Sequence, residues 1–175
     1  MTSVREAKPL PPHGLPDASR VWRALGSVAD PELPVVSIVE LGIVRDVCCT
    51  DDECTLTLTP TYSGCPATRA IEADAKAAVA GVTDKRVRVV TALTPAWRSD
   101  WIAPEARRKL AAFGIAPPRH GAPETAIIAV DRVAIACPHC GSRRTEEIAR
   151  FGSTACKAQY RCRDCLEPFD YFKPH

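Results

Sequence analysis

The sequence predicts an α+β fold: a small mixed β-sheet with helices on one face, followed by a C-terminal zinc-ribbon-like β module. Two observations predict it. Amphipathic helical segments and alternating strand segments follow one another up to about residue 114, and two Cys-x-x-Cys pairs lie in the last fifty residues. The chain has 175 residues, of which 46% are hydrophobic and 25% are charged, and this suits one full domain with a small appendage.

The predicted domain follows a flexible N-terminal segment, residues 1–16, which carries charges and prolines but no long apolar stretch. Asp17 is placed to cap a helix with one apolar stripe, and Asp30-Pro31 is expected to end that helix. The run 43–48 and the alternating run 55–59 predict two strands joined by a polar turn. We therefore expect a hairpin with one buried face.

A strand–helix–strand crossover is expected next. Pro66 should open a helix that ends at Gly81, because proline suits the first helical position and glycine suits the position after the last one. A third strand is expected over 87–92, and a last helix over 101–113 closes the domain at Gly114. The right-handed rule for such crossovers then gives a small mixed sheet with helices over one face.

A proline-rich segment, residues 115–125, has the composition of a linker. The expected boundaries are therefore 17–114 for the α+β domain and 126–175 for a tetracysteine metal-binding module. Short strands are expected in the module at 145–148, 158–161 and 169–172.

Several classes of function are excluded by what the sequence lacks. The longest apolar runs have five residues, so no membrane span is expected, and without an export signal the protein is expected in the cytoplasm. Residues 1–126 carry 15 basic and 15 acidic side chains and residues 127–175 carry 8 and 6, so no nucleic-acid partner is expected. Dinucleotide and P-loop glycine motifs are absent, as are the Glu-x-x-His pairs of a di-iron oxygenase.

The C-terminal cysteines form the most specific motif. Cys137-Pro-His-Cys140 and Cys162-Arg-Asp-Cys165 are separated by 21 residues, and four thiolates at this spacing can surround one ion tetrahedrally. Gly141 suits the turn because glycine tolerates a positive φ. A module of this size needs a structural metal to fold, so we expect zinc, with redox-active iron as the alternative.

Cys156 is a fifth cysteine in this module, in the run Phe151-Gly-Ser-Thr-Ala-Cys156-Lys157. Two interpretations stay open. It is either a small buried residue or a thiol with its own chemistry beside Lys157, and it is a possible additional metal ligand.

Cys65 is the second candidate site, in Tyr62-Ser-Gly-Cys65-Pro66. If Pro66 is the first helical residue, Cys65 is the cap, and the helix dipole should lower the pKa of its thiol. Such a thiol can transfer a soft metal; the alternative is a buried cap cysteine without chemistry. Asp30 and Glu32 either line the same cleft or are solvated turn residues, and Cys48, Cys49 and Cys54 are expected to be packing residues.

Two longer motifs resemble known families. The run from Asp30-Pro-Glu-Leu-Pro to Gly-Ile-Val-Arg-Asp46, with Tyr62-Ser-Gly-Cys65-Pro, resembles the MIP18-like (DUF59) domain of iron–sulfur assembly factors. The tail, with Cys137-Pro-His-Cys-Gly-Ser, the run around Cys156 and the second cysteine pair, looks like the PaaD/PaaJ-type D component of bacterial phenylacetyl-CoA epoxidase. The likeness spans residue 17 to the end.

The resemblance implies an accessory protein of aerobic phenylacetate degradation, not an enzyme, that assists assembly or maintenance of the iron and iron–sulfur centres of that multicomponent epoxidase. Its implied partners are the di-iron oxygenase and the 2Fe-2S reductase subunits, with a possible homodimer. By the same resemblance, Cys65, Asp30 and Glu32 match the assembly-domain motif, with Cys65 as a transient iron or cluster ligand. A non-catalytic structural subunit and a rubredoxin-like electron carrier are the alternative functions.

Overall fold

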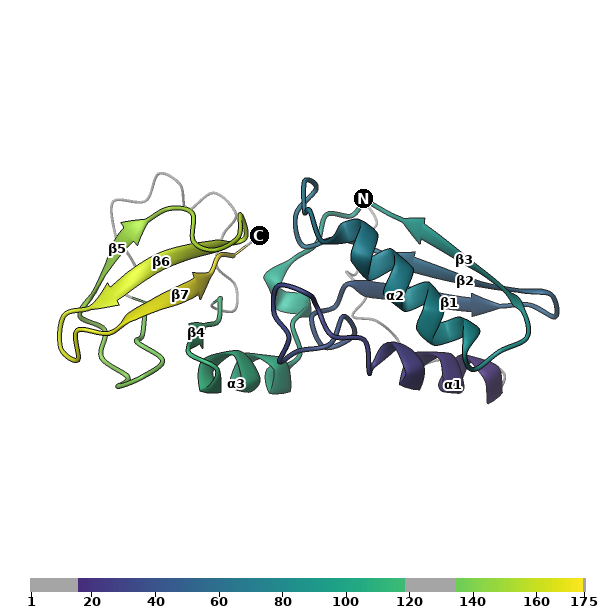
Figure 1. Cartoon of the computed structure of the whole chain (residues 1–175), viewed down its shortest axis with the longest axis horizontal. Helices are drawn as coiled ribbons and strands as arrows, with labels where there is room; N and C mark the ends of the chain where they lie inside the picture. Colours follow the sequence, from purple (N-terminus) through teal and green to yellow (C-terminus); the bar gives the residue numbers. More distant parts are fainter. Residues whose placement is uncertain (1–15, 119–134, 175) are drawn as a thin grey trace, which may run out of the picture.

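The computed structural model describes residues 16–118 and 135–174 and contains two β-sheets (Figure 1). The first has three strands in the order β1-β2-β3, and the second has four in the order β4-β7-β6-β5. This confirms the predicted α+β fold with a separate β module at the C-terminal end. Within these residues, none of the helices combines the length and the hydropathy that a membrane span requires.

The first sheet is mixed, as predicted. Strand β2 pairs antiparallel with β1 through a short hairpin and parallel with β3, because α2 forms the crossover between them. Helices α1 and α2 lie over the same face of the sheet (Figure 1). The elements of this part are α1 (Pro16–Leu25), β1 (Val44–Cys49), β2 (Glu53–Leu58), α2 (Thr68–Ala80), β3 (Arg86–Thr91), a 3-10 turn η1 (Ser99–Trp101) and α3 (Pro104–Ala112).

Helix α1 ends before the predicted stop. It finishes at Leu25, and the N–H groups of Gly26, Ser27 and Val28 donate the turn-type hydrogen bonds that follow, so Asp30-Pro31 does not end it. The expected last helix is also divided: a 3-10 turn and the extended residues Ile102 and Ala103 precede α3. Proline at the start of α3 fixes where the regular helix can begin.

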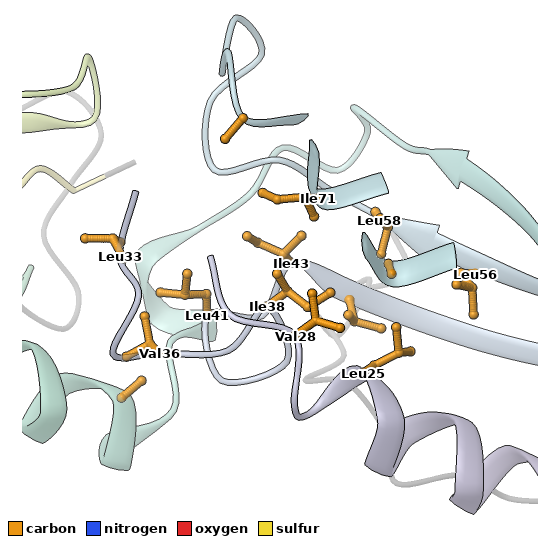
Figure 2. Packing of buried hydrophobic residues seen from close by; sticks show 14 of the residues in the cluster. Leu25, Val28, Leu33, Val36, Ile38, Leu41, Ile43, Leu56, Leu58 and Ile71 are labelled. Atoms are coloured by element: carbon orange, nitrogen blue, oxygen red, sulfur yellow. The ribbon is translucent and has the colours of Figure 1, made fainter. Parts of the chain in front are cut away.

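The loop between α1 and β1 belongs to the hydrophobic core. Ile38 and Leu41 in this loop are fully buried and belong to the same hydrophobic cluster as Leu25 of α1 and Leu56 of β2 (Figure 2). Asp30 is held there too, because its backbone N–H donates to the carbonyl of Val36 at 3.0 Å. The core therefore fixes the position of the loop that carries the two candidate carboxylates.

The β1–β2 hairpin corrects one expectation about cysteines. Cys49 and Cys54 stand opposite each other in the antiparallel register and form a disulfide. Cys54 is fully buried, as a packing residue should be, whereas Cys48 is exposed. The alternation of β1 places Cys48 and Cys49 on opposite faces of the sheet, so only one of them can reach Cys54.

The second sheet is formed by β4 (Ile115–Ala116), β5 (Thr145–Ala149), β6 (Lys157–Cys162) and β7 (Pro168–Phe172). The last three agree with the predicted strands to within one residue at each end. Residues 115 and 116 were expected in the linker, but they pair in parallel with β7 and so belong to this sheet. The remainder of the expected linker from residue 119 lies outside the described residues, and the domain boundaries stay a prediction.

The C-terminal module packs directly on the first core. Phe172, at the end of β7, is fully buried in that core, and its ring centroid lies 5.9 Å from the ring of Trp97. Trp97 is fixed in turn, because its indole N–H donates to the carbonyl of Leu41 at 2.9 Å. Cys156 also belongs to this core cluster. An edge of the C-terminal module is thereby held against the loop that contains Asp30.

Candidate metal centres

The four cysteines of the two Cys-x-x-Cys pairs meet in the C-terminal module. Their sulfur atoms all lie within 4.8 Å of one another, in an arrangement that can hold a metal ion. The Sγ atoms of Cys137 and Cys165 are 3.7 Å apart, and those of Cys140 and Cys162 are 3.6 Å apart. A tetrahedral site with zinc–sulfur bonds of about 2.3 Å places its sulfurs about 3.8 Å apart. The donor set and its spacing therefore fit a tetrathiolate metal.

The two cysteine turns have matching backbone geometry. Cys137 donates its N–H to the carbonyl of Ser142 at 2.8 Å, and Cys162 donates to that of Glu167 at 3.0 Å, in both cases five residues ahead. The residue after each pair has a positive φ: Gly141 at 76° and Leu166 at 68°. Gly141 indicated a left-handed residue in the first turn, because glycine tolerates a positive φ. Leucine rarely adopts this conformation, so the positive φ of Leu166 in the second turn was not predicted.

Backbone amides stabilise negative charge on the sulfurs. The N–H of Cys165 is the main cause that lowers the pKa of Cys162 to about 6, and the N–H of Asp164, 3.4 Å from the same sulfur, adds to it. This is the amide-to-sulfur pattern expected where tight turns present thiolates to a metal. The turns therefore favour the deprotonated form of Cys162 that a metal requires.

The hydrophobic cluster formed by the described residues of the C-terminal module, 135–174 with β4, is small. It contains six buried residues, and two of these, Cys137 and Cys162, are members of the sulfur group. The others are Ala116, Ala158, Phe169 and Tyr171. So little apolar burial supports the expectation that a bound metal supplies much of the folding energy.

Cys156 lies apart from the sulfur group. The group that can hold a metal consists of the other four cysteines of the module, whereas the Cys156 thiol is 3.6 Å from Oε2 of Glu32. Cys156 is 6% exposed, and burial is the main cause that raises its pKa to about 11. The structure thus places this thiol beside the N-terminal candidate site, which the sequence spacing could not show.

Cys65 lies near the start of α2, but it is not the cap. The helix begins at Thr68 with Ala67 as its N-cap, so the expectation that Pro66 opens the helix is wrong by two residues. The N–H of Ala67 still hydrogen-bonds the Cys65 sulfur, yet burial outweighs it and raises the pKa of the thiol. The expected lowering of that pKa is therefore wrong in direction. Cys65 is half-buried and follows an exposed segment, residues 62–64.

Two carboxylates lie close enough to Cys65 to affect its charge. The negative charges of Glu32 and Asp30 both raise the pKa of the Cys65 thiol. Asp30 is 6% exposed, and its Oδ1 accepts the N–H groups of Glu32 at 2.8 Å and Leu33 at 3.0 Å. Burial raises the pKa of Asp30 in spite of these bonds. Asp30 therefore shapes the loop, while Glu32 presents a carboxylate between the two modules.

Two different family models match separate parts of the chain. Residues 18–111 match a family model described as iron–sulfur cluster assembly protein, and residues 122–173 match one described as PaaD zinc beta ribbon domain. A curated Escherichia coli (strain K12) protein, named as the putative D component of 1,2-phenylacetyl-CoA epoxidase, is 43% identical over 164 residues, which are 90% of this chain and 93% of that protein. The chain belongs to this family of epoxidase D components.

Solved structures resemble the assembly part of this family member. A DUF59 domain from Bacillus anthracis is 30% identical and covers 51% of this chain and 87% of its own, with a TM-score of 0.48. A conserved hypothetical protein from Thermotoga maritima is 32% identical and covers 52% and 90%, with a TM-score of 0.42.

Proposed function

We propose that this protein is a non-catalytic accessory factor of aerobic phenylacetate degradation that assists assembly or maintenance of the iron and iron–sulfur centres of phenylacetyl-CoA epoxidase. The relative named as a component of that epoxidase and the match to an assembly-type family support this proposal. The proposed partners are the di-iron oxygenase and the reductase with its 2Fe-2S centre. A cytoplasmic location is part of the proposal.

The observation that carries the proposal is the environment of Cys65. Its thiol is half-buried, beside an exposed segment, with two carboxylates within electrostatic reach. The raised pKa keeps the Cys65 sulfur protonated, and so unreactive, near neutral pH when no cation is bound to it. The negative charges of Glu32 and Asp30 that cause part of this shift also attract a cation, and binding of the cation displaces the proton. Such a thiol can accept an iron species and release it again.

The tetracysteine group has a separate role in this proposal. Cys137, Cys140, Cys162 and Cys165 bind zinc, which would supply the cross-link that holds the two cysteine turns together. The protein contributes the preformed sulfur spacing and the amides that favour thiolate at Cys162. The module in turn positions Phe172 against Trp97 and so holds the two sheets together.

The symmetry of the two cysteine turns favours one alternative, a rubredoxin-like electron carrier. Paired turns with amide-to-sulfur hydrogen bonds also suit a single iron ion that changes oxidation state. In that case the protein purified under anaerobic conditions would contain iron at this site and be coloured. Zinc in a colourless protein supports the structural role, which a purely architectural component of the epoxidase would share.

The proposed function is tested in cells that lack the protein and are complemented with variants of it. Cys65→Ser should leave the chain folded and its zinc content unchanged, but the epoxidase purified from these cells should lose most of its iron and 2Fe-2S content. Cys48→Ser, which changes an exposed cysteine of β1, is the matched control and should restore full loading. Normal cluster content with Cys65→Ser would refute the proposal and leave the structural-subunit alternative.

A further inference from the structure

The thiol of Cys156 lies where it can act together with the N-terminal candidate site. It is carried by the connection between β5 and β6, and this connection contacts the other part of the chain. The Cys156 sulfur is 3.6 Å from Oε2 of Glu32 and 3.1 Å from the hydroxyl of Thr154. Glu32 thus contacts a thiol that lies 124 positions later in the sequence.

The position of Cys156 is fixed by packing on both sides. Its carbonyl accepts the N–H of Lys173 at 3.0 Å, next to Phe172, which is fully buried against the N-terminal core. The neighbouring Lys157 is 5% exposed and pairs with Asp170, with 3.5 Å between Nζ and Oδ2. The charge of Lys157 also acts on Asp30 across the interface. These contacts fix the backbone at Cys156 and so hold its thiol beside Glu32.

The two thiols share one carboxylate. Glu32 accepts the hydrogen bond from Cys156, and its charge also raises the pKa of Cys65, so the same carboxylate acts on both thiols. Two sulfurs and one carboxylate are a donor set for a thiophilic divalent ion such as Fe²⁺ or Zn²⁺. Among the described residues, the tetracysteine group is the one set of three or more donors that already lies within 4.8 Å. Binding of one ion by all three groups therefore requires Cys65 to move closer to Cys156; residues 62–64, which precede Cys65, are exposed.

We propose that Cys156 is a second thiol ligand of the Cys65 site. The iron that this protein transfers is then bound between the two modules by Cys65, Glu32 and Cys156. Each thiol loses one proton to water on binding, and no electrons are transferred. The inference rests on the proposed function and deepens it, because it makes docking of the C-terminal module a condition for carrying the metal.

The test uses the full chain with zinc in the tetracysteine group and Co²⁺ as the probe for a further site. Under anaerobic, reducing conditions, wild-type protein should bind a further equivalent of Co²⁺ with sulfur-to-cobalt charge-transfer absorption. Cys156→Ser should lower the intensity of that absorption by about half. It should also weaken binding at least tenfold, since even the loss of an outer-shell partner typically costs 10- to 100-fold. Thr154→Val, which keeps the thiol but removes its hydroxyl neighbour, is the packing control and should keep both thiolates on cobalt.

A measurement without any variant keeps the inference testable if Cys156→Ser disturbs docking. X-ray absorption at the cobalt edge of wild-type protein should show two sulfur ligands on the further ion. One sulfur, or unchanged binding in Cys156→Ser together with loss in Cys65→Ser, would overturn the inference and leave the proposed function intact. If wild-type protein bound no further Co²⁺ at all, both the inference and the proposed metal-carrying role of Cys65 would be contradicted.

Discussion

Removal of metal from the tetracysteine group should unfold the C-terminal sheet and leave the N-terminal sheet folded. The reason is the small size of the second hydrophobic cluster, which among the described residues has four buried members besides Cys137 and Cys162. The first cluster is several times larger and contains all three helices and strands β1 to β3 in its packing. The two sheets should therefore differ sharply in their dependence on metal.

The expected loss of stability of the C-terminal module follows from typical free energies of zinc binding and of folding. A structural zinc contributes about 10–16 kcal/mol to folding near neutral pH, whereas whole domains are stable by only about 5–15 kcal/mol. With six buried side chains in the described part of its own cluster, the module is expected at the weak end of that range. Loss of the ion should therefore make it unstable by several kcal/mol, so that the unfolded form predominates.

Hydrogen exchange measured by mass spectrometry, before and after treatment with a strong chelator, is the direct assay. Amides of β6 should lose their protection, amides of β2 should keep theirs, and added zinc should restore the original pattern. Trp97 provides a second readout, because unfolding of β7 removes Phe172 from its ring and should shift its fluorescence to longer wavelength. Retained protection of β6 in metal-free protein would refute the argument.

Two further predictions concern single residues. Leu166→Gly should stabilise the zinc-loaded chain by about 0.5–1 kcal/mol, because relief of a left-handed leucine exceeds the added flexibility of glycine, and Gly141→Ala should cost about 1 kcal/mol. Denaturant titrations at fixed free zinc measure both changes in stability. If both variants unfolded at the same denaturant concentration as wild type, the backbone conformation at these two positions would not affect stability as expected. Alkylation of Cys65 by iodoacetamide should be slow at pH 7 and accelerate as the pH rises toward its raised pKa, since only the thiolate reacts. Glu32→Gln removes a negative charge near Cys65, which should lower the pKa of the Cys65 thiol and speed its alkylation at pH 7. The exposed Cys48 is the control, and its alkylation rate should not change. An unchanged rate at Cys65 would show that Glu32 does not act on this thiol.

The features that the sequence predicts well depend on local spacing. The two cysteines of each pair have two residues between them and are brought together by one tight turn. The sequence alone therefore indicated a tetracysteine group, and its sulfurs do meet. The alternating residues of β2 and the apolar stripe of α2 likewise predicted a hairpin and a crossover helix. These elements follow from interactions between near neighbours in the chain.

The features that were missed depend on contacts between distant segments or on competing energies. Nothing near Cys156 in the sequence shows that it would face Glu32, since that contact requires both modules to be folded and docked. The pKa of Cys65 was predicted to fall because the helix start is close, but burial and two carboxylates outweigh the single amide. The Cys49–Cys54 pair depends on the strand register, which a run of residues does not reveal on its own.

The central claim is that Cys65 carries iron while the tetracysteine group binds zinc. It is tested most directly by measuring iron and zinc per chain, together with the visible spectrum, after anaerobic incubation with Fe³⁺, a thiol reductant and sulfide and removal of unbound metal. Wild-type protein should retain iron and colour beside one zinc, and Cys65→Ser should retain the zinc alone. Equal iron and equal absorption in the two proteins would contradict the claim.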